Sequence, residues 1–278
     1  MDDLESHVAA HYAPGHLMHA IHEALTRAGA DPAALRPEDL KPVDEFHVGG
    51  LEATAELLDP LGIDADTRVL DLGSGIGGTA RFLASRHGAT VTGIDLTPEF
   101  VEAARALSRS VGLDDQVTFN LGSVLDMPFA ADQFDLATML HVGMNLADKS
   151  ALFAEVFRVL APGGRFALYD IMTGTNAAAI DYPVPWSSTP AESFVVAPDI
   201  YRGVAEAAGF ELVAERDRSA FATDFFQRVA AQTAANGVPP VGLHLLMGEA
   251  AAERYGNAAK ATIDGRLSPW EMVFRKPG

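Results

Sequence analysis

A run of glycines beside a carboxylate has the residue types needed to bind a small charged ligand. Asp71 lies in an apolar run at 68–72, directly before the segment Gly73-Ser74-Gly75-Ile76-Gly77-Gly78. Glycine tolerates positive φ in a tight turn and lets a ligand approach the backbone, and the helix that follows offers unpaired N–H groups. A carboxylate ahead of this turn is expected to point at the floor of a cavity. There it would repel a pyrophosphate and hold an ammonium group.

The glycine spacing leaves a second ligand open. Gly73, Gly75 and Gly78 satisfy the G-x-G-x-x-G pattern of dinucleotide-binding proteins, so an NAD-dependent oxidoreductase is the alternative of another class. The negative charge of Asp71 disfavours this alternative. A glycine turn that binds no ligand is a third interpretation.

A second acid, Asp95, ends the next predicted strand, 22 residues after Gly73. An acid in this position accepts hydrogen bonds from both hydroxyl groups of a ribose. The alternative is a helix cap, because Thr97-Pro98-Glu99 follows with proline in the first turn of a helix.

Two histidines are candidates for proton transfer. His141 directly follows the fourth predicted strand, at the carboxyl edge where open α/β sheets bind their ligands. Histidine titrates near neutral pH, so His141 is the candidate general base, the alternative being a hydrogen-bonded residue that shapes the pocket. His47 precedes Gly49 and Gly50, and we expect it either to approach the ligand or only to begin a helix.

The loop at 176–186 follows the fifth predicted strand and should overhang the acceptor. Tyr182 and Trp186 in this loop could form an apolar or cation-binding wall, or only pack the loop. Tyr12 and Asn145 are two further candidates for the same pocket. Histidines at helical spacing crowd the first 22 residues, but no nearby acid completes a site, so we predict no metal.

Composition disfavours several kinds of partner. The 278 residues are 48% hydrophobic, enough for a full core, and the formal net charge is −18. A surface this acidic repels phosphate backbones and anionic lipids, so we expect a small-molecule partner, with neither nucleic acid nor a membrane. There is no cysteine, and the acidic N-terminus does not resemble a secretory signal. We therefore expect a cytoplasmic protein and leave a homodimer open.

The elements that must position these residues alternate between strand and helix. This alternation predicts parallel βαβ units. We expect two helices at 3–29 broken at Pro14–Gly15, then a proline-punctuated linker around 32–42. The expected strands are 68–72, 90–95, 117–121, 134–140, 165–170, 210–215 and a last one at 270–276, and the last helices are 224–236 and 243–264.

Several motifs together resemble one enzyme family. DLGSGIGG, then GID, PFAADQFDLA and RVLAPGG, are similar to the class I S-adenosylmethionine-dependent methyltransferases over about residues 45–170. The resemblance implies an α/β fold with a Rossmann-like, seven-stranded, doubly wound sheet of order 3-2-1-4-5-7-6 and an antiparallel last strand. It also implies an N-terminal helical lid at 1–45, a core at 46–217 and 269–278, and a helical insertion at 218–268 that covers the substrate.

The resemblance further assigns residues to the cofactor, S-adenosylmethionine. The turn at Gly73–Gly77 would hold the methionine part and Asp95 the ribose. Leu96 and Val124 would enclose the adenine ring. Ser123 stands where many relatives have an acid for the adenine amino group. Leu140 and His141 would line the path to the methyl group.

The function implied is methyl transfer to a small molecule by in-line displacement, with S-adenosylhomocysteine as product. The segments HVGMNLADK and YDIM and the loop with Trp186 are similar to the sarcosine/dimethylglycine N-methyltransferases, which favours an amine acceptor. The alternative is C- or O-methylation of a quinone or secondary metabolite, with His141 as base. A member that keeps the cofactor only as structure is a third class.

Overall fold

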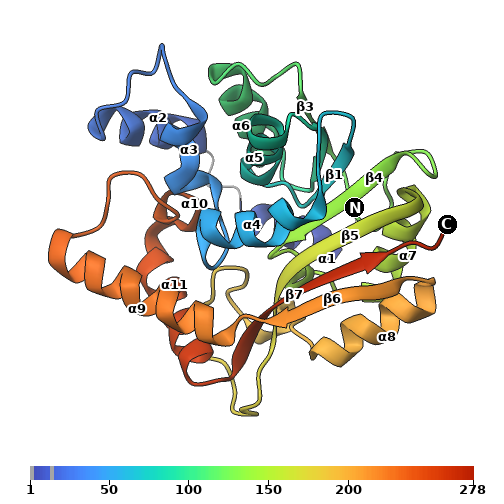
Figure 1. The fold of residues 1–278 in the computed structure, drawn as a ribbon. Helices are drawn as coiled ribbons and strands as arrows, with labels where there is room; N and C mark the ends of the chain where they lie inside the picture. Colours follow the sequence, from blue (N-terminus) through green and yellow to red (C-terminus); the bar gives the residue numbers. More distant parts are fainter. Residues whose placement is uncertain (1–2, 13–15) are drawn as a thin grey trace.

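Seven strands form one sheet at the centre of the molecule. The structure is a computed structural model that describes residues 3–12 and 16–278. The strands lie in the order β3-β2-β1-β4-β5-β7-β6, with β7 antiparallel to both neighbours (Figure 1), which confirms the predicted Rossmann-like fold. Their bounds are β1 (Arg68–Leu72), β2 (Thr90–Asp95), β3 (Val117–Leu121), β4 (Phe134–Leu140), β5 (Leu160–Thr173), β6 (Glu211–Asp217) and β7 (Leu267–Arg275).

Alternate residues along the central strands pack on opposite faces of the sheet. Val69 and Val273 pack with one group of helices, whereas Leu70 and Met272 pack with the other. The two-residue period of a strand produces this division, and covering both faces explains the continuous apolar runs in the sequence. The first face carries α4 (Gly50–Leu58), α5 (Gly78–His87) and α6 (Pro98–Ser110), and the second carries α7 (Lys149–Val159) and α8 (Pro198–Ala208).

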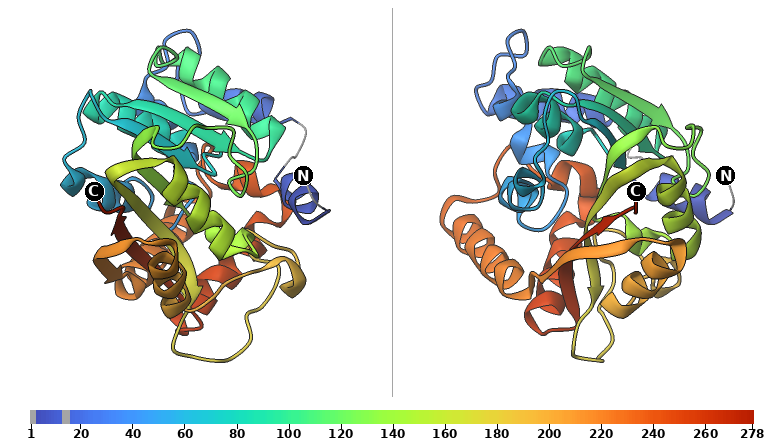
Figure 2. Two further views of the ribbon diagram at one scale, coloured as in Figure 1. Left: turned by 90° about the vertical axis from the view of Figure 1, so that its right-hand side faces the viewer. Right: turned by 45° about the vertical axis from the view of Figure 1, so that its right-hand side comes forward.

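Two further groups of helices meet at one end of the sheet (Figures 1 and 2). Leu17 and Ile21 of the N-terminal group share an apolar cluster with Leu246 of the group between β6 and β7. The N-terminal group is α1 (Asp3–His11), α2 (Leu17–Arg27) and α3 (Pro37–Asp44). The later group is α9 (Ser219–Asn236), α10 (His244–Met247) and α11 (Ala251–Ile263). Short 3-10 turns lie at Asp59–Leu61, Gly143–Asn145, Pro190–Glu192 and Gly248–Ala250.

Several predicted boundaries are wrong. The linker expected around 32–42 contains α3, because Pro37 occupies the first helical position and the Asp39 carboxylate accepts the Arg36 N–H at 2.9 Å. The helix expected at 243–264 is divided at Gly248, which has a φ of 69°. The last strand begins at Leu267, opposite Thr173, so the strand takes the final residues of the insertion predicted as 218–268. The predicted break at Pro14–Gly15 lies outside the described residues.

A buried ion pair fixes α3 against the start of α5. The Arg81 Nε donates to Asp44 Oδ2 at 3.2 Å, and the two side chains are only 1% and 5% exposed. Arg81 also donates to the Ser108 hydroxyl at 3.1 Å. A Cβ at Gly78 would lie 2.1 Å from the Asp44 carbonyl oxygen, so only glycine permits this approach. The end of the N-terminal helical group is thus attached to the helix that follows the glycine turn.

Replacing Arg81 by Met should destabilise the protein by about 3–5 kcal/mol, because the Asp44 carboxylate would remain buried without its partner. The matched control is Arg86→Met, which removes the half-exposed pair with Asp59 and should cost about 0–1 kcal/mol. Urea unfolding of the two variants and the parent measures both values. Equal losses for the two variants would contradict the role given to the buried pair.

Candidate active site

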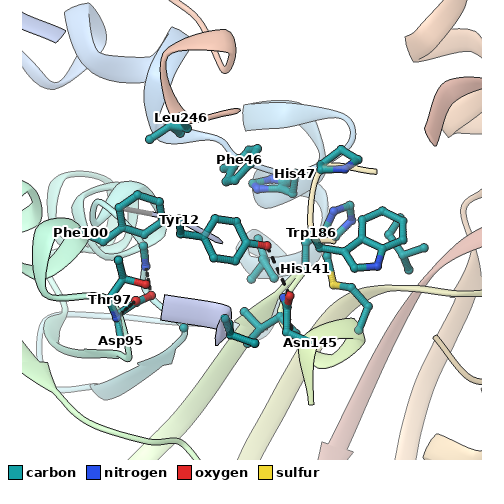
Figure 3. A pocket seen from close by; sticks show the side chains of 18 of the residues that line it. Tyr12, Phe46, His47, Asp95, Thr97, Phe100, His141, Asn145, Trp186 and Leu246 are labelled. Atoms are coloured by element: carbon teal, nitrogen blue, oxygen red, sulfur yellow. Dashed lines mark hydrogen bonds between the residues drawn. The ribbon is translucent and has the colours of Figure 1, made fainter. Parts of the chain in front are cut away.

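The carboxyl ends of β1 to β5 border a cavity of ≈ 260 Å³. Its lining comes from the segments that directly follow β1, β2, β3 and β4, and from α1, α9, α10 and α11. Figure 3 shows Tyr12 in the middle of this cavity, with Asp95 toward one side and Trp186 toward the other. Segments far apart in the sequence therefore contribute to one site.

The turn after β1 forms part of the lining through Gly73, Ser74 and Gly75. Gly73 has a φ of 64°, and a Cβ there would lie 2.5 Å from a methyl group of Val142. The Ser74 N–H donates to the Ile94 carbonyl at 3.1 Å, but its buried hydroxyl has no hydrogen-bond partner. The turn thus borders the cavity and contains a buried, unpartnered hydroxyl.

Asp71 does not line the cavity, contrary to the expectation that its carboxylate points at the cavity floor. It is 2% exposed because alternation along β1 directs its side chain into the sheet face, where Oδ1 accepts the Thr138 hydroxyl at 2.8 Å. Its Oδ2 has no partner. Burial raises the pKa of Asp71 to about 7, against the opposing effect of the Thr138 hydrogen bond. Gly77, the N-cap of α5, also lies outside the lining.

Asp95 lines the cavity at the end of β2. Its Oδ2 accepts the Gly75 N–H and its Oδ1 accepts the Thr97 N–H, both at 2.8 Å. Burial raises the pKa of Asp95, while these backbone hydrogen bonds oppose the rise. The carboxylate therefore joins the glycine turn to the start of α6 and still borders the cavity, so the helix-cap interpretation and the binding interpretation describe the same side chain.

The loop after β3 completes this side of the cavity. Leu96 and Val124 line it, as expected of residues that enclose a flat ring. Ser123 also lines it, and its hydroxyl donates to the carboxylate of Glu5 from α1. No sequence signal indicated Glu5, because nothing local relates an N-terminal helix to a loop 118 residues later.

His141 lines the cavity directly after β4, beside Leu140. It has a φ of 55°, uncommon for a residue with a side chain, and its buried Nε2 has no partner. Its ring centroid lies 4.8 Å from that of Tyr169 and 5.8 Å from that of His47. Burial lowers the pKa of His141 well below its usual value, so the ring is a neutral base at neutral pH.

His47 lines the cavity but has partners of its own. Its Nε2 lies 2.9 Å from the Thr54 hydroxyl oxygen and 3.2 Å from the Gly50 carbonyl oxygen. The Thr54 hydroxyl in turn donates to Glu45 at 2.8 Å. Burial lowers the pKa of His47 to about 4. These bonds fix the turn before α4, so His47 begins a helix, one of the two roles expected for it. They also place a neutral ring on the cavity wall.

Three of the four predicted substrate residues line the cavity, and Tyr182 does not. The Tyr12 hydroxyl donates to Asn145 Oδ1 at 3.4 Å, across the space between Asp95 and Trp186 (Figure 3). Tyr182 instead packs beside the apolar cluster of Trp186, because the chain turns between them at the Val184–Ser187 bridge. The loop therefore contributes one of its two predicted aromatic residues.

The aromatic side of the cavity contains residues that sequence reasoning missed. The Phe226 ring of α9 and the Tyr255 ring of α11 lie 5.2 Å apart, and the buried Tyr255 hydroxyl has no partner. The sequence predicted a helical insertion over the substrate. That prediction did not indicate which faces of the inserted helices line the cavity. We use the name "aromatic side" for Met144, Ile171, Trp186, Phe226, Tyr255 and Ala258, all of which line the cavity.

Within 3–12 and 16–278, no helix is both long and apolar enough to cross a bilayer. The same residues contain no group of three or more acidic, histidine or cysteine side chains placed to hold a metal ion.

Comparison with known proteins identifies the central segment. Residues 70–168 match the family model described as "Methyltransferase domain". Methyltransferase GfsG of Streptomyces halstedii is 37% identical over 134 residues, which cover 48% of each chain. The chain thus spans about half the length of this curated relative. Other matched relatives are named as O-methyltransferases or N-methyltransferases, so the acceptor atom differs among them.

Solved structures share the fold over most of the chain. A Galdieria sulphuraria protein provisionally described as a sarcosine dimethylglycine methyltransferase is 24% identical, with a TM-score of 0.66 over 82% of this chain and 85% of that one. The geranyl diphosphate C-methyltransferase of Streptomyces coelicolor A3(2) is 17% identical, with a TM-score of 0.71 over 99% and 98%. At these identities the similarity establishes the fold alone.

Proposed function

Because residues 70–168 match the family model described as "Methyltransferase domain", we propose that this chain is a class I methyltransferase that transfers a methyl group from S-adenosylmethionine to a small-molecule acceptor. One observation carries the proposal. The cavity combines a glycine turn and Asp95 on one side with a neutral, unpartnered histidine and an aromatic wall on the other. This arrangement would bring a nucleoside ligand and an acceptor together in one cavity.

The described residues fit the proposed cofactor. Two buried polar atoms near the glycine turn, Asp71 Oδ2 and Ser74 Oγ, have no hydrogen-bond partner within the protein, and a bound amino-acid group beside the turn would complement their polarity. Asp95 and the pair Leu96 and Val124 stand where a ribose and an adenine ring would be held. When bound, the cofactor supplies a methyl group on a positively charged sulfur. Asp71 lies beneath the cavity lining, so it would attract the positive charge of the cofactor without touching it. Electric fields are only weakly screened in a poorly solvated interior.

The proposed acceptor is an amine, and the chain's own residues support this choice. Trp186, Tyr12 and Phe46 offer aromatic faces or edges to the cavity, and aromatic faces attract cations. Burial in such a cavity disfavours a charged amine and so favours the neutral form that can attack carbon. His141 would accept the proton or hydrogen bond of the acceptor at its unpartnered Nε2. The rest of the wall excludes water and aligns the acceptor.

A second candidate, a carbon or oxygen acceptor, is favoured by the same histidine. These acceptors need a positioned base, and His141 is the unpartnered neutral base of the cavity lining. The two candidates differ in how strongly the rate depends on this side chain.

Calorimetry with S-adenosylhomocysteine tests the cofactor. We expect saturable binding that weakens about 10–100-fold in Asp71→Asn, because the ammonium group of the ligand would lose the attraction of the carboxylate beneath the lining. Burial raises the pKa of Asp71 to about 7, so the ammonium group should favour the ionised carboxylate, and binding should tighten as pH rises toward 8. Release of the Asp71 proton below this pH should also make the binding enthalpy depend on the buffer.

The matched control for this measurement is Asp115→Asn, which alters an exposed acid before β3 and should change nothing. The absence of saturable binding would refute the cofactor. A binding enthalpy that does not depend on the buffer in the parent protein would refute the proposed deprotonation of Asp71 but not the cofactor. Binding without methyl transfer to any amine, hydroxyl or carbon acceptor would indicate a protein that keeps the cofactor only as structure.

We also propose that Glu5 supplies the acid that the sequence lacks at position 123. Ser123 holds Glu5 at the cavity lining through its hydroxyl, next to the proposed adenine site. Glu5→Gln should therefore weaken S-adenosylhomocysteine about 5–30-fold, the effect of one charged hydrogen bond to the adenine amino group. The parent protein should bind S-adenosylhomocysteine more tightly than the inosine analogue, which lacks that amino group. Glu5→Gln should abolish this difference in affinity. Calorimetry of both ligands, with Glu23→Gln of α2 as control, decides the point.

Replacing His141 by Ala separates the two classes of acceptor. Turnover with a carbon or oxygen acceptor should fall about 10²–10⁴-fold, whereas a tertiary amine has no proton to lose and should react at nearly the parent rate. Methyl transfer is measured at saturating S-adenosylmethionine, with cofactor affinity as the control for folding. Equal losses with both kinds of acceptor would mean that His141 shapes the pocket and is not the base.

A further inference from the structure

The charged side chains of the cavity lining are all acids. Within the described residues these are Glu5, Asp44, Asp95 and Asp148, and the lining contains neither lysine nor arginine. The two lining histidines do not change this balance, because burial lowers the pKa of both. Asp44 is paired with Arg81, so an anionic group that enters the cavity would meet the other three acids and no lysine or arginine of the lining.

The basic side chains nearest to the lining are bonded elsewhere. Arg254 of α11 contacts the His11 ring nitrogen at 2.7 Å and donates to the Val184 carbonyl oxygen at 3.2 Å. Lys149 donates to the carbonyl oxygen of Phe194 at 3.0 Å. Arg81 is paired with Asp44. Each of these cations satisfies buried carbonyl groups or a carboxylate, so turning one into the cavity would leave those groups unsatisfied.

The aromatic side offers apolar contact and few polar anchors. Ile171, Trp186 and Ala258 belong to one apolar cluster, and the Trp186 indole N–H is already satisfied by Ser193 at 2.9 Å. Outside the glycine turn, two described lining residues have a buried polar atom without a partner that could serve as an anchor, Tyr255 of this side with its hydroxyl and His141 after β4 with its Nε2. Both can hydrogen-bond a neutral or cationic acceptor, and neither can neutralise a phosphate.

We propose that the methyl acceptor is a predominantly apolar molecule without phosphate or any other anionic group, held by the aromatic side and oriented by Tyr255 and His141. This inference rests on the proposed methyl transfer and narrows its substrate. A phosphate buried here would lose its hydration without gaining a cation, which costs several kcal/mol. The chain would thus differ from its structural neighbour, whose crystal holds a geranyl thiolodiphosphate with Mg²⁺.

Three ligands with the same ten-carbon body test the proposal. Geraniol, geranylamine and geranyl diphosphate are titrated into protein saturated with S-adenosylhomocysteine, and quenching of Trp186 fluorescence is followed in a Trp270→Phe background. Geraniol or geranylamine should bind at least tenfold more tightly than the diphosphate. Tighter binding of geraniol would indicate a neutral acceptor, and tighter binding of geranylamine would indicate a cationic one. Diphosphate binding as tight as either would overturn the proposal, and so would the failure of all three to bind.

A matched pair of variants shows where the ligand binds. Ala258→Phe fills the aromatic side, whereas Ala252→Phe places the same ring on the exposed face of the same helix. The first should weaken the preferred ligand at least tenfold with S-adenosylhomocysteine affinity retained, and the second should weaken neither. Unchanged binding in Ala258→Phe would overturn the assignment to this side. Loss of S-adenosylhomocysteine binding in the parent would instead refute the proposed function, so the two failures are distinguishable.

Discussion

The site depends on carboxylates that are buried without a cation. In the described part of the chain, Asp71 and Asp95 form no ion pair, and each has neutral hydrogen-bond partners only. Isolated charges are costly in a protein interior, and burial raises the pKa of both groups. Asp95 offsets this cost by accepting the Gly75 and Thr97 N–H groups of the turns after β1 and β2, and Asp71 by accepting the Thr138 hydroxyl. A positively charged ligand would stabilise both carboxylates further.

The other walls of the cavity come from α1 and from the helices between β6 and β7. α1 contributes Glu5 and its last turn leads to Tyr12, while α11 contributes Tyr255 and Ala258. His11 and Arg254 join these two segments directly. A ligand enclosed by both would contact residues some 240 positions apart. Such enclosure excludes water, which strengthens every electrostatic interaction with the bound molecule.

The sequence predicted the core well because its signals are local. A strand that runs into Gly73 and a strand that ends at Asp95 define neighbouring positions at one sheet edge once the parallel topology is known. The side-chain direction of Asp71 was not predictable, since it depends on register within β1 and on Thr138 of the adjacent strand. Glu5 and Tyr255 depend on the packing of peripheral helices. No spacing rule relates such residues to the sheet.

The charge of the lining also bears on the chemistry. Transfer to an amine moves a positive charge from sulfur to nitrogen within the same cavity, so acids that stabilise the reactants still face a cation afterward. Transfer to an oxygen or carbon anion requires a negative charge to form first, in a cavity whose described lining has acids but no lysine or arginine to stabilise that charge. Like charges in a poorly solvated cavity repel strongly. The acidic lining therefore supports the amine acceptor that we propose, because its charge matches both ends of that reaction.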